Sequence, residues 1–242
     1  MVITSKENEH VKLYKKIASD KKSRGEYGLF ALEGFRLVAD ADILLSSVFY
    51  TEKYAEKIGN IKSERYFEIS ERVAEKISDT KTPQGVFALA YTPKCEISAQ
   101  GKIVVLYELS DPGNIGTIIR TADALGVSGI LAVSCADIYS PKTVRAAMGA
   151  LLRVNIEVTD SESALKKLQN TAKFAAVADK NAETLGEFVF PEDAAVFIGN
   201  EANGLPEEIV KQCKSITIPM RGNAESLNAA AAASILIYEL SK

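Results

Sequence analysis

Short apolar runs that alternate with helical stretches are the strongest structural signal in this chain, and they are clearest after residue 101. Helices are expected at about 114–125, 142–151 and 227–240. The strand candidates around them are 103–107, 130–133, 153–158, 174–178, 195–198 and 215–218. Strands separated by helices of about 10 to 15 residues are typical of βαβ units. This part of the chain therefore predicts an α/β fold with a mostly parallel sheet.

The first hundred residues show shorter elements of the same two kinds. Strand candidates lie at 29–32, 48–50, 65–69 and 86–91, and helical stretches lie at 35–45 and 71–78. The segment 92–101 is polar, carries proline and glycine and has no periodicity, which is typical of a linker. We therefore predict a small α/β domain over 1–92, a linker over 93–101 and a second domain over 102–242.

The charge balance excludes one class of protein. The 242 residues include 29 Lys and Arg against 32 Asp and Glu, for a formal net charge of −3. A strongly basic nucleic-acid binder is therefore excluded, although a local basic surface is not. The segment 5–25 is such a surface, because its seven basic and three acidic residues give +4. Val11, Tyr14 and Ile17 recur there at helical spacing, so the lysines form either a solvated helix face or a phosphate-contacting one.

Histidine and cysteine are too scarce for several kinds of chemistry. His10 is the only histidine, which argues against a histidine base or a cluster of histidine metal ligands. Cys95, Cys135 and Cys213 are far apart and none lies in a C-x-x-C motif. They are typical of thiols in a reducing compartment rather than of disulfides or a zinc site, so we expect no metal.

The sequence contains no obvious membrane or export segment. The first residues lack an apolar signal core, and the longest apolar run, about 229–237, is shorter than the roughly 20 residues of a membrane span. We therefore expect a soluble protein of the cytoplasm.

Three loops that follow predicted strands are rich in glycine, asparagine and proline: 111–120, 199–206 and 218–228. In parallel sheets, ligands bind at the carboxyl ends of strands, where such loops lie. In the first loop we expect Asn114 to cap a helix, and Arg120 is either a functional cation or the partner of Asp123 in a surface pair. In the third, Ser226 or Asn228 is the natural N-cap of the last helix.

Several common catalytic motifs are absent. There is no G-x-G-x-x-G after the first strand of the second half, no G-x-x-x-x-G-K-[ST] and no G-x-S-x-G. A standard dinucleotide-binding fold and Ser-His-Asp hydrolysis are therefore disfavoured, and P-loop phosphoryl transfer is excluded. What remains is chemistry in which the protein positions the reactants through backbone groups and a few Asn, Ser, Arg and Glu side chains.

In their order and spacing, the three loops resemble the three motifs of the SpoU/TrmH family of RNA ribose 2′-O-methyltransferases, part of the SPOUT superfamily. The matching residues are Asn114-Ile-Gly-x-x-x-Arg120, Gly199-x-Glu201-x-x-Gly204-Leu205 and Ile218-Pro-Met…Glu225-Ser-Leu-Asn228. The segment 141–150 is also similar to a family segment, although Ala147 stands where many members have serine.

The first hundred residues resemble the substrate-binding domain that precedes the catalytic domain in many members. The similar pieces are Asn8 to Lys16, Phe30-Ala-Leu-Glu-Gly34 with Arg36, and Thr82-Pro-Gln-Gly-Val86. In the family, this domain is a ribosomal-protein-like RNA-binding module. The resemblance therefore spans nearly the whole chain.

The resemblance implies properties that residue patterns alone do not give. The second domain would be a SPOUT domain with a C-terminal trefoil knot, a topology that is otherwise very rare. It would bind S-adenosylmethionine, form a homodimer and transfer a methyl group to a ribose 2′-hydroxyl. We expect ribosomal RNA as the substrate, with tRNA as the alternative. A third possibility is an RNA-binding or ribosome-assembly factor of the same fold that has lost activity.

The resemblance also assigns candidate roles to residues. Arg120 would orient the RNA phosphate and stabilise the developing alkoxide, since an arginine stays protonated and is a poor base. The catalytic candidates are Arg120, Asn114, Glu201, Ser226 and Asn228. The cofactor-binding candidates are Gly199, Glu201, Gly204, Ile218, Met220 and Leu227. The RNA-binding candidates are Lys12, Lys15, Lys16, Lys21, Lys22, Arg24, Arg36, Lys142 and Arg145.

Overall fold

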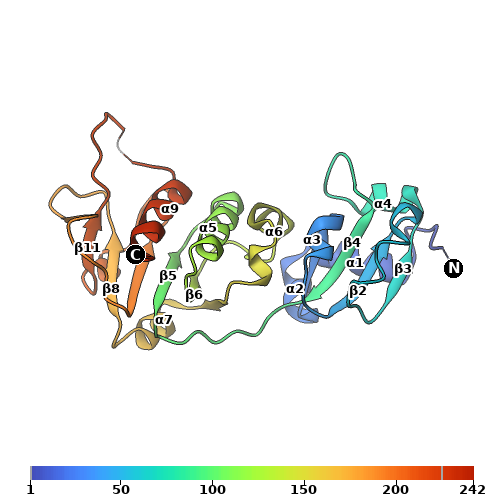
Figure 1. Cartoon of the computed structure of the whole chain (residues 1–242), viewed down its shortest axis with the longest axis horizontal. Helices are drawn as coiled ribbons and strands as arrows, with labels where there is room; N and C mark the ends of the chain where they lie inside the picture. Colours follow the sequence, from blue (N-terminus) through green and yellow to red (C-terminus); the bar gives the residue numbers. More distant parts are fainter. Residues whose placement is uncertain (1, 225) are drawn as a thin grey trace. The chain divides into compact units, whose positions relative to one another are not determined.

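The computed structural model describes residues 2–224 and 226–242, and it divides into two compact units (Figure 1). Unit 1 comprises Met1–Pro93 with Tyr139–Leu152, and unit 2 comprises Lys94–Ile138 with Arg153–Lys242. A segment from the middle of the chain is thus grouped with the N-terminal residues. The domain boundaries at 92 and 102 remain a prediction.

Unit 1 contains a four-stranded sheet and short helices. Across the sheet, the strands are β1 (Leu29–Glu33), β4 (Val86–Tyr91), β2 (Leu45–Tyr50) and β3 (Tyr66–Glu68). The helices are α1 (Glu9–Ser19), α2 (Lys21–Tyr27), α3 (Phe35–Ala39), α4 (Glu71–Ile77) and α6 (Pro141–Ala147), with 3-10 turns η1 (Glu52–Tyr54) and η2 (Ala150–Leu152). The four predicted strands are confirmed.

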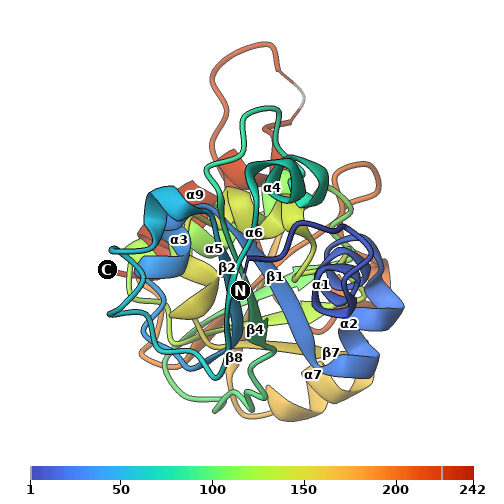
Figure 2. The same ribbon diagram turned by 90° about the vertical axis from the view of Figure 1, so that its right-hand side faces the viewer.

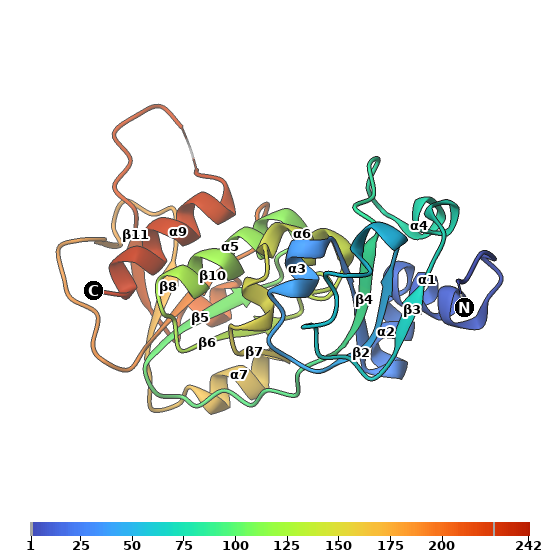
Figure 3. The ribbon, with the colours of Figure 1, turned by 45° about the vertical axis from the view of Figure 1, so that its right-hand side comes forward.

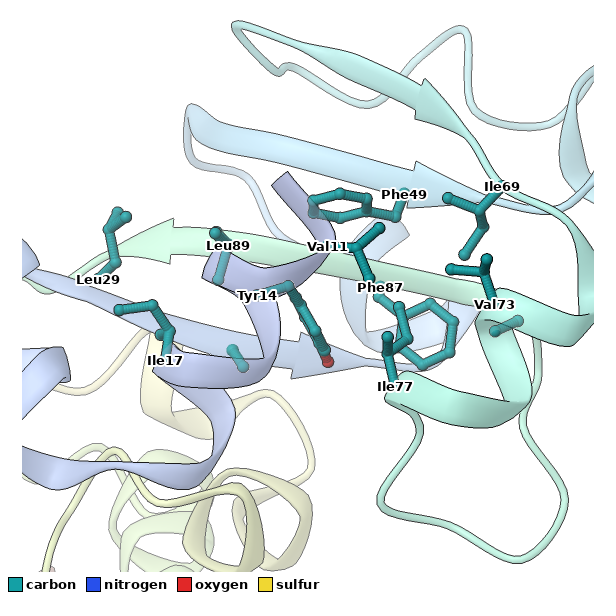
Figure 4. Packing of buried hydrophobic residues seen from close by; sticks show 12 residues of the cluster. Val11, Tyr14, Ile17, Leu29, Phe49, Ile69, Val73, Ile77, Phe87 and Leu89 are labelled. Carbon is teal, nitrogen blue, oxygen red and sulfur yellow. The ribbon is translucent and has the colours of Figure 1, made fainter. Parts of the chain in front are cut away.

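The core of unit 1 forms where α1 and α4 cover the sheet (Figure 4). Tyr14 of α1 is 2% exposed, and its ring meets Phe49 and Phe87 edge-on at 5.7 and 5.6 Å between centroids. Its hydroxyl donates to the carbonyl of Leu32 over 3.2 Å, so the buried polar tip has a partner. The apolar face predicted from Val11, Tyr14 and Ile17 is therefore the face that builds this core.

Two helical predictions in unit 1 need correction. The helical stretch 35–45 ends early, at Ala39, because Leu45 is fully buried and pairs with Ala90 in the sheet. The basic segment contains two helices rather than one. Its break is at Asp20, whose carboxylate accepts from the backbone N–H groups of Lys22 and Ser23 and caps α2.

Unit 2 is built on a seven-stranded sheet whose neighbouring strands are all parallel. Across the sheet, the strands are β7 (Ile156–Thr159), β6 (Gly129–Val133), β5 (Lys102–Tyr107), β10 (Ala194–Ile198), β8 (Ala172–Ala176), β11 (Lys214–Thr217) and β9 (Glu183–Thr184). The predicted parallel sheet and α/β class are confirmed.

Helices cover both faces of this sheet (Figures 1 and 3). On one face lie α5 (Pro112–Ala124) and α9 (Ala229–Leu240), joined by a hydrogen bond of 3.2 Å between the hydroxyls of Thr121 and Ser234. On the other lie α7 (Ser161–Lys167) and α8 (Glu207–Val210), over a buried cluster that includes Val105, Leu131 and Phe197. The trefoil knot remains a prediction.

No helix in the described part of the chain is long and apolar enough to cross a membrane.

Candidate active site

The carboxyl ends of the parallel strands bring the three sequence loops to one edge of the unit 2 sheet. The segment after β5 leads into α5, the turn after β10 leads into α8, and the segment after β11 leads into α9. The predicted site residues of this unit belong to these three segments or to α5 itself. The order of the strands in the sheet thus brings together three loops that are far apart in the sequence.

Glu201 links the turn after β10 to the start of α5. Its carboxylate accepts from the backbone N–H and the hydroxyl of Ser110, over 3.2 and 3.1 Å, and from the N–H of Asp111 over 3.3 Å. It also accepts from the side-chain amide of Asn114 over 3.0 Å. These donors surround both carboxylate oxygens, so Glu201 is held in one orientation.

The same contacts determine the protonation of Glu201. Partial burial is the largest single influence and raises its pKa, but the hydrogen bonds from Asn114, Ser110 and Asp111 together outweigh it. The pKa of Glu201 is therefore below its ordinary value of 4.5, and the group is a carboxylate at neutral pH. It is an acceptor that orients its neighbours, not a proton donor.

Asn114 connects the first motif to the third. Its side-chain oxygen accepts from the amide of Asn228 over 3.1 Å, while its own amide donates to Glu201. Asn228 is the N-cap of α9 and accepts from the N–H groups of Ala230 and Ala231, as predicted. The cap predicted at Asn114 is wrong: Asp111 caps α5 by accepting from the N–H of Asn114, and Pro112 occupies the first turn.

The turn after β10 is too tight for a side chain at its first position. A Cβ built on Gly199 would lie 2.4 Å from the carbonyl carbon of Gly204 and 2.5 Å from the nitrogen of Leu205. Asn200 and Gly204 exchange backbone hydrogen bonds of 3.0 and 2.9 Å, and Gly204 has a φ of +67°. The side-chain amide of Asn200 also donates to the carbonyl of Glu108 over 2.7 Å, which ties this turn to the end of β5.

Arg120 is an exposed cation on the outer face of α5. The predicted alternative, a pair with Asp123, is not formed, because Asp123 accepts three hydrogen bonds from Arg153 over 2.5 to 3.2 Å. Among the described residues, the guanidinium of Arg120 has no hydrogen bond or ion pair. It is therefore available to an anionic ligand.

The segment after β11 contributes apolar groups at the same edge. Met220 and Leu227 are each 38% exposed, so both side chains are accessible to a ligand. Ile218 is half-buried, and Ser226 is exposed with no side-chain hydrogen bond in the described structure. Glu225 lies outside the described residues.

The RNA-binding candidates differ in their exposure to solvent and in their ion pairs. Those on α1 and α2 except Arg24 are exposed: Lys12, Lys15, Lys16, Lys21 and Lys22. Arg24 is buried and donates to the carbonyls of Ile17 and Ala18 over 2.6 and 3.1 Å, so it fastens α2 to α1. Arg36 and Lys142 are exposed, and the Nε of Arg36 lies 3.7 Å from a carboxylate oxygen of Asp40. Arg145 pairs with Asp79 over 2.6 Å.

Two polar residues of the site were missed in the sequence. Ser110 gives Glu201 two hydrogen bonds, and Asn200 joins two strand ends. Asn200 directly precedes Glu201 in a loop that was selected for its asparagines. The asparagine content of that loop was therefore the signal that could have identified Asn200. Nothing local marks Ser110, because its partner is 91 residues away.

A metal site needs a group of histidine, cysteine, aspartate or glutamate side chains, and a cysteine nucleophile needs a thiolate. No group of histidine, cysteine, aspartate and glutamate side chains suited to a metal ion occurs among the described residues. Burial raises the pKa of Cys135 and of Cys213 to about 11 each, so both are protonated thiols at neutral pH.

Two family models match the chain. The model of the SpoU rRNA Methylase family matches residues 101–238, and that of the MRM3-like substrate binding domain matches residues 8–88. These matches confirm the resemblance identified from the three loops and from the first hundred residues.

Full-length relatives and solved structures agree. The 23S rRNA (guanosine(2553)-2′-O)-methyltransferase RlmP of Bacillus subtilis is 31% identical over 246 residues, which cover 98% of each chain. An AdoMet-bound rRNA methyltransferase from Sinorhizobium meliloti has a TM-score of 0.85 and 30% identity, over 99% of this chain and 97% of that one. The SpoU methyltransferase AviRb from Streptomyces viridochromogenes, in complex with AdoMet, has a TM-score of 0.84 and 25% identity, over 97% of each chain.

Proposed function

The chain belongs to the SpoU rRNA methylase family, and we propose that this S-adenosylmethionine-dependent RNA ribose 2′-O-methyltransferase acts on ribosomal RNA with Arg120 as its main catalytic side chain. The observation that carries the proposal is the network around Glu201. It joins all three motif segments at one sheet edge, while the guanidinium of Arg120 has no hydrogen bond or ion pair among the described residues.

The residues at this edge suit S-adenosylmethionine, which supplies an electrophilic methyl group on a sulfonium when bound. At the tight turn of this edge, a Cβ on Gly199 would meet the main chain of Gly204 and Leu205, so main-chain groups rather than a side chain form this part of the site. We propose that Gly199, Gly204 and Ile218 hold the cofactor through main-chain groups. The exposed side chains of Met220 and Leu227 would cover its apolar parts.

The protein's task is to position a weak nucleophile. A ribose 2′-hydroxyl is poorly acidic, and alignment with the methyl group removes much of the entropic barrier. Arg120 stays protonated, so it stabilises the developing alkoxide and orients an adjacent phosphate by paired N–H donors. We propose a phosphate oxygen of the RNA as the proton acceptor. Asn114, Glu201, Ser226 and Asn228 would orient these groups.

Ribosomal RNA is favoured over tRNA as the substrate. One relative that covers 98% of this chain is named as a 23S rRNA methyltransferase, and residues 8–88 match a substrate binding domain. We propose the large-subunit RNA as the target and, with it, the cytoplasm as the site of action.

A homodimer is proposed from the outer face of α9. Ile235 and Tyr238 are 40% and 55% exposed, although they lie on a helix whose other face is fully buried. With Ala231 they form an apolar stripe at i, i+4, i+7 spacing, which fits a second copy of the same helix surface. The trefoil knot is proposed on the family resemblance.

Calorimetric titration with S-adenosylmethionine separates an enzyme from an inactive assembly factor. We expect a saturable heat with one site per chain for the wild-type protein, and a much weaker one for Gly199→Ala. The absence of binding by the wild-type protein would contradict the assignment and favour the assembly factor.

A further inference from the structure

The first two helices of unit 1, α1 and α2, follow each other directly along the chain (Figure 2), and both carry lysines. Lys12, Lys15 and Lys16 have i, i+3, i+4 spacing on the exposed face of α1, and Lys21 and Lys22 begin α2. We call these five lysines, together with Tyr27, the basic corner.

Most cations of the basic corner have no acidic partner. Lys12 pairs with Glu7 over 2.7 Å, but no ion pair of Lys15, Lys21 or Lys22 is found among the described residues. The acid in their midst, Asp20, is occupied as the N-cap of α2. The charge is therefore available to a polyanion.

The corner is also rigidly built. The buried guanidinium of Arg24 donates to two carbonyls in the last turns of α1 and so fixes the angle between the helices. Gly28 ends α2 with a φ of +62° and turns the chain directly into β1. A binding surface that is held in place in this way loses little conformational entropy when it binds a ligand.

Tyr27 adds an aromatic ring to this charge. It is the last residue of α2 and is 45% exposed, and the ammonium of Lys16 lies 5.0 Å from its ring centroid. No hydrogen bond of its hydroxyl is found in the described structure. An exposed ring without a polar partner, set among lysines, has the composition of surfaces that bind unpaired nucleotides.

We propose that the basic corner binds a single-stranded segment of the RNA substrate, with Tyr27 stacked on an unpaired base and Lys15, Lys16, Lys21 and Lys22 contacting the flanking phosphates. This inference rests on the proposed function for the identity of the ligand. It assigns the contact to a surface outside the candidate active site.

A second tyrosine with two lysines gives a matched control. The ammonium groups of Lys53 and Lys57 lie 5.4 and 5.9 Å from the ring centroid of Tyr54. However, Phe35 stacks on that ring at 5.0 Å, and Glu52 and Glu56 alternate with the lysines. This surface has the same residue types but no net positive charge.

Fluorescence anisotropy with the full chain tests the proposal. The probes are a labelled 20-nucleotide single-stranded RNA of mixed sequence and a 20-base-pair RNA duplex. We expect Tyr27→Ala to weaken single-strand binding by about tenfold, the loss of one stacked base, and Tyr27→Phe to restore it. We expect Lys15→Gln with Lys16→Gln, and Lys21→Gln with Lys22→Gln, to lower the slope of log affinity against log salt by about 0.7 for each lost phosphate contact.

The control is Lys53→Gln with Lys57→Gln, which we expect to leave affinity and salt slope unchanged. Equal losses in the control and corner variants, full affinity in Tyr27→Ala, or tighter binding of the duplex would each overturn the proposal. Circular dichroism of every variant excludes unfolding as the cause. The separate S-adenosylmethionine titration tests the enzymatic assignment, so failure of one proposal is distinguishable from failure of the other.

Discussion

The side-chain amide of Asn228 donates to the side-chain oxygen of Asn114 over 3.1 Å, although the two residues are 114 positions apart. Asn114 in turn donates to Glu201. These two hydrogen bonds connect the start of α9 to the first turn of α5, and the first turn of α5 to the turn after β10. The geometry of the candidate active site thus depends on Asn114 as its central member.

Asn114→Ala removes both hydrogen bonds at once. We expect kcat/KM to fall by about 10 to 100-fold, because the loss leaves the Glu201 carboxylate and the Asn228 amide without a positioned partner. Initial rates of methyl transfer measure this. Thr117→Ala is the control, since its hydroxyl donates only to the carbonyl of Gly113 in the same helix. Equal rates for Asn114→Ala and wild type would contradict the role of the network.

Arg120→Lys keeps the positive charge but removes the planar pair of donors. We expect kcat to fall by about 100-fold while S-adenosylmethionine affinity stays the same, because the guanidinium acts on the RNA and the alkoxide. The control is Arg153→Lys on the neighbouring surface, which we expect to retain its rate. Activity of Arg120→Lys near the wild-type value would count against bidentate orientation.

The pH dependence of stability tests the charge state of Glu201. Its pKa is lowered in the folded protein, so its stabilising contribution is present above the ordinary value of 4.5 and is lost as the pH falls below it. We therefore expect wild type to exceed Glu201→Gln in stability at pH 7 and the difference to shrink between pH 5 and pH 3.5. Urea unfolding across this range measures it. A constant or growing difference would show that the carboxylate is not stabilised by its hydrogen bonds.

Gly199→Ala places a methyl group against the backbone of the following turn. We expect a destabilisation of about 1 to 3 kcal/mol and a loss of cofactor affinity, because Gly204 and Leu205 have to move. Thermal unfolding and calorimetry provide the two readouts. Gly59→Ala is the control, since a Cβ at that position would have no neighbouring atom within 4 Å and the φ of Gly59 is ordinary. Unchanged cofactor binding by Gly199→Ala would remove this turn from the cofactor site.

Tyr238→Asp, combined with Ile235→Asp, tests the proposed dimer. Two charges on the exposed apolar stripe of α9 are expected to convert the dimer to a monomer, because each carboxylate would lose its hydration in the interface. Sedimentation velocity gives the mass. Val158→Asp is a matched control, as Val158 is 63% exposed elsewhere in unit 2. Identical masses for the α9 double variant and wild type would locate any interface elsewhere.

Much of unit 2 could be predicted from local pattern. Parallel strands are buried on both faces, so they are continuous apolar runs, and the loops after them are readily located. The two-residue strand β9 (Glu183–Thr184) is too short to leave such a pattern. The grouping of Tyr139–Leu152 with unit 1 is a long-range property that local spacing does not reveal.

The helix caps, hydrogen bonds and ion pairs of unit 2 and of α2 were harder to predict from the sequence. Asp111 and Asn114 are both good N-caps, and only Pro112 in the first turn favours the former. The i, i+3 spacing of Arg120 and Asp123 suggested a pair, but Arg153 binds Asp123 from 30 residues away. Arg24 was grouped with exposed lysines because charge patterns do not reveal burial. Only the pairing of Asp123 with Arg153 was decided by a distant partner; the other two outcomes depended on neighbouring residues.

The most direct measurement is the position of the methyl group on RNA. Purified protein is incubated with unmodified ribosomal RNA and S-adenosylmethionine labelled in its methyl group, and the RNA is then digested to nucleosides. We expect the label in a single 2′-O-methylated nucleoside of the large-subunit RNA and a much smaller amount with Arg120→Lys. Label on a base, or no transfer to ribosomal RNA by protein that binds the cofactor, would contradict the account.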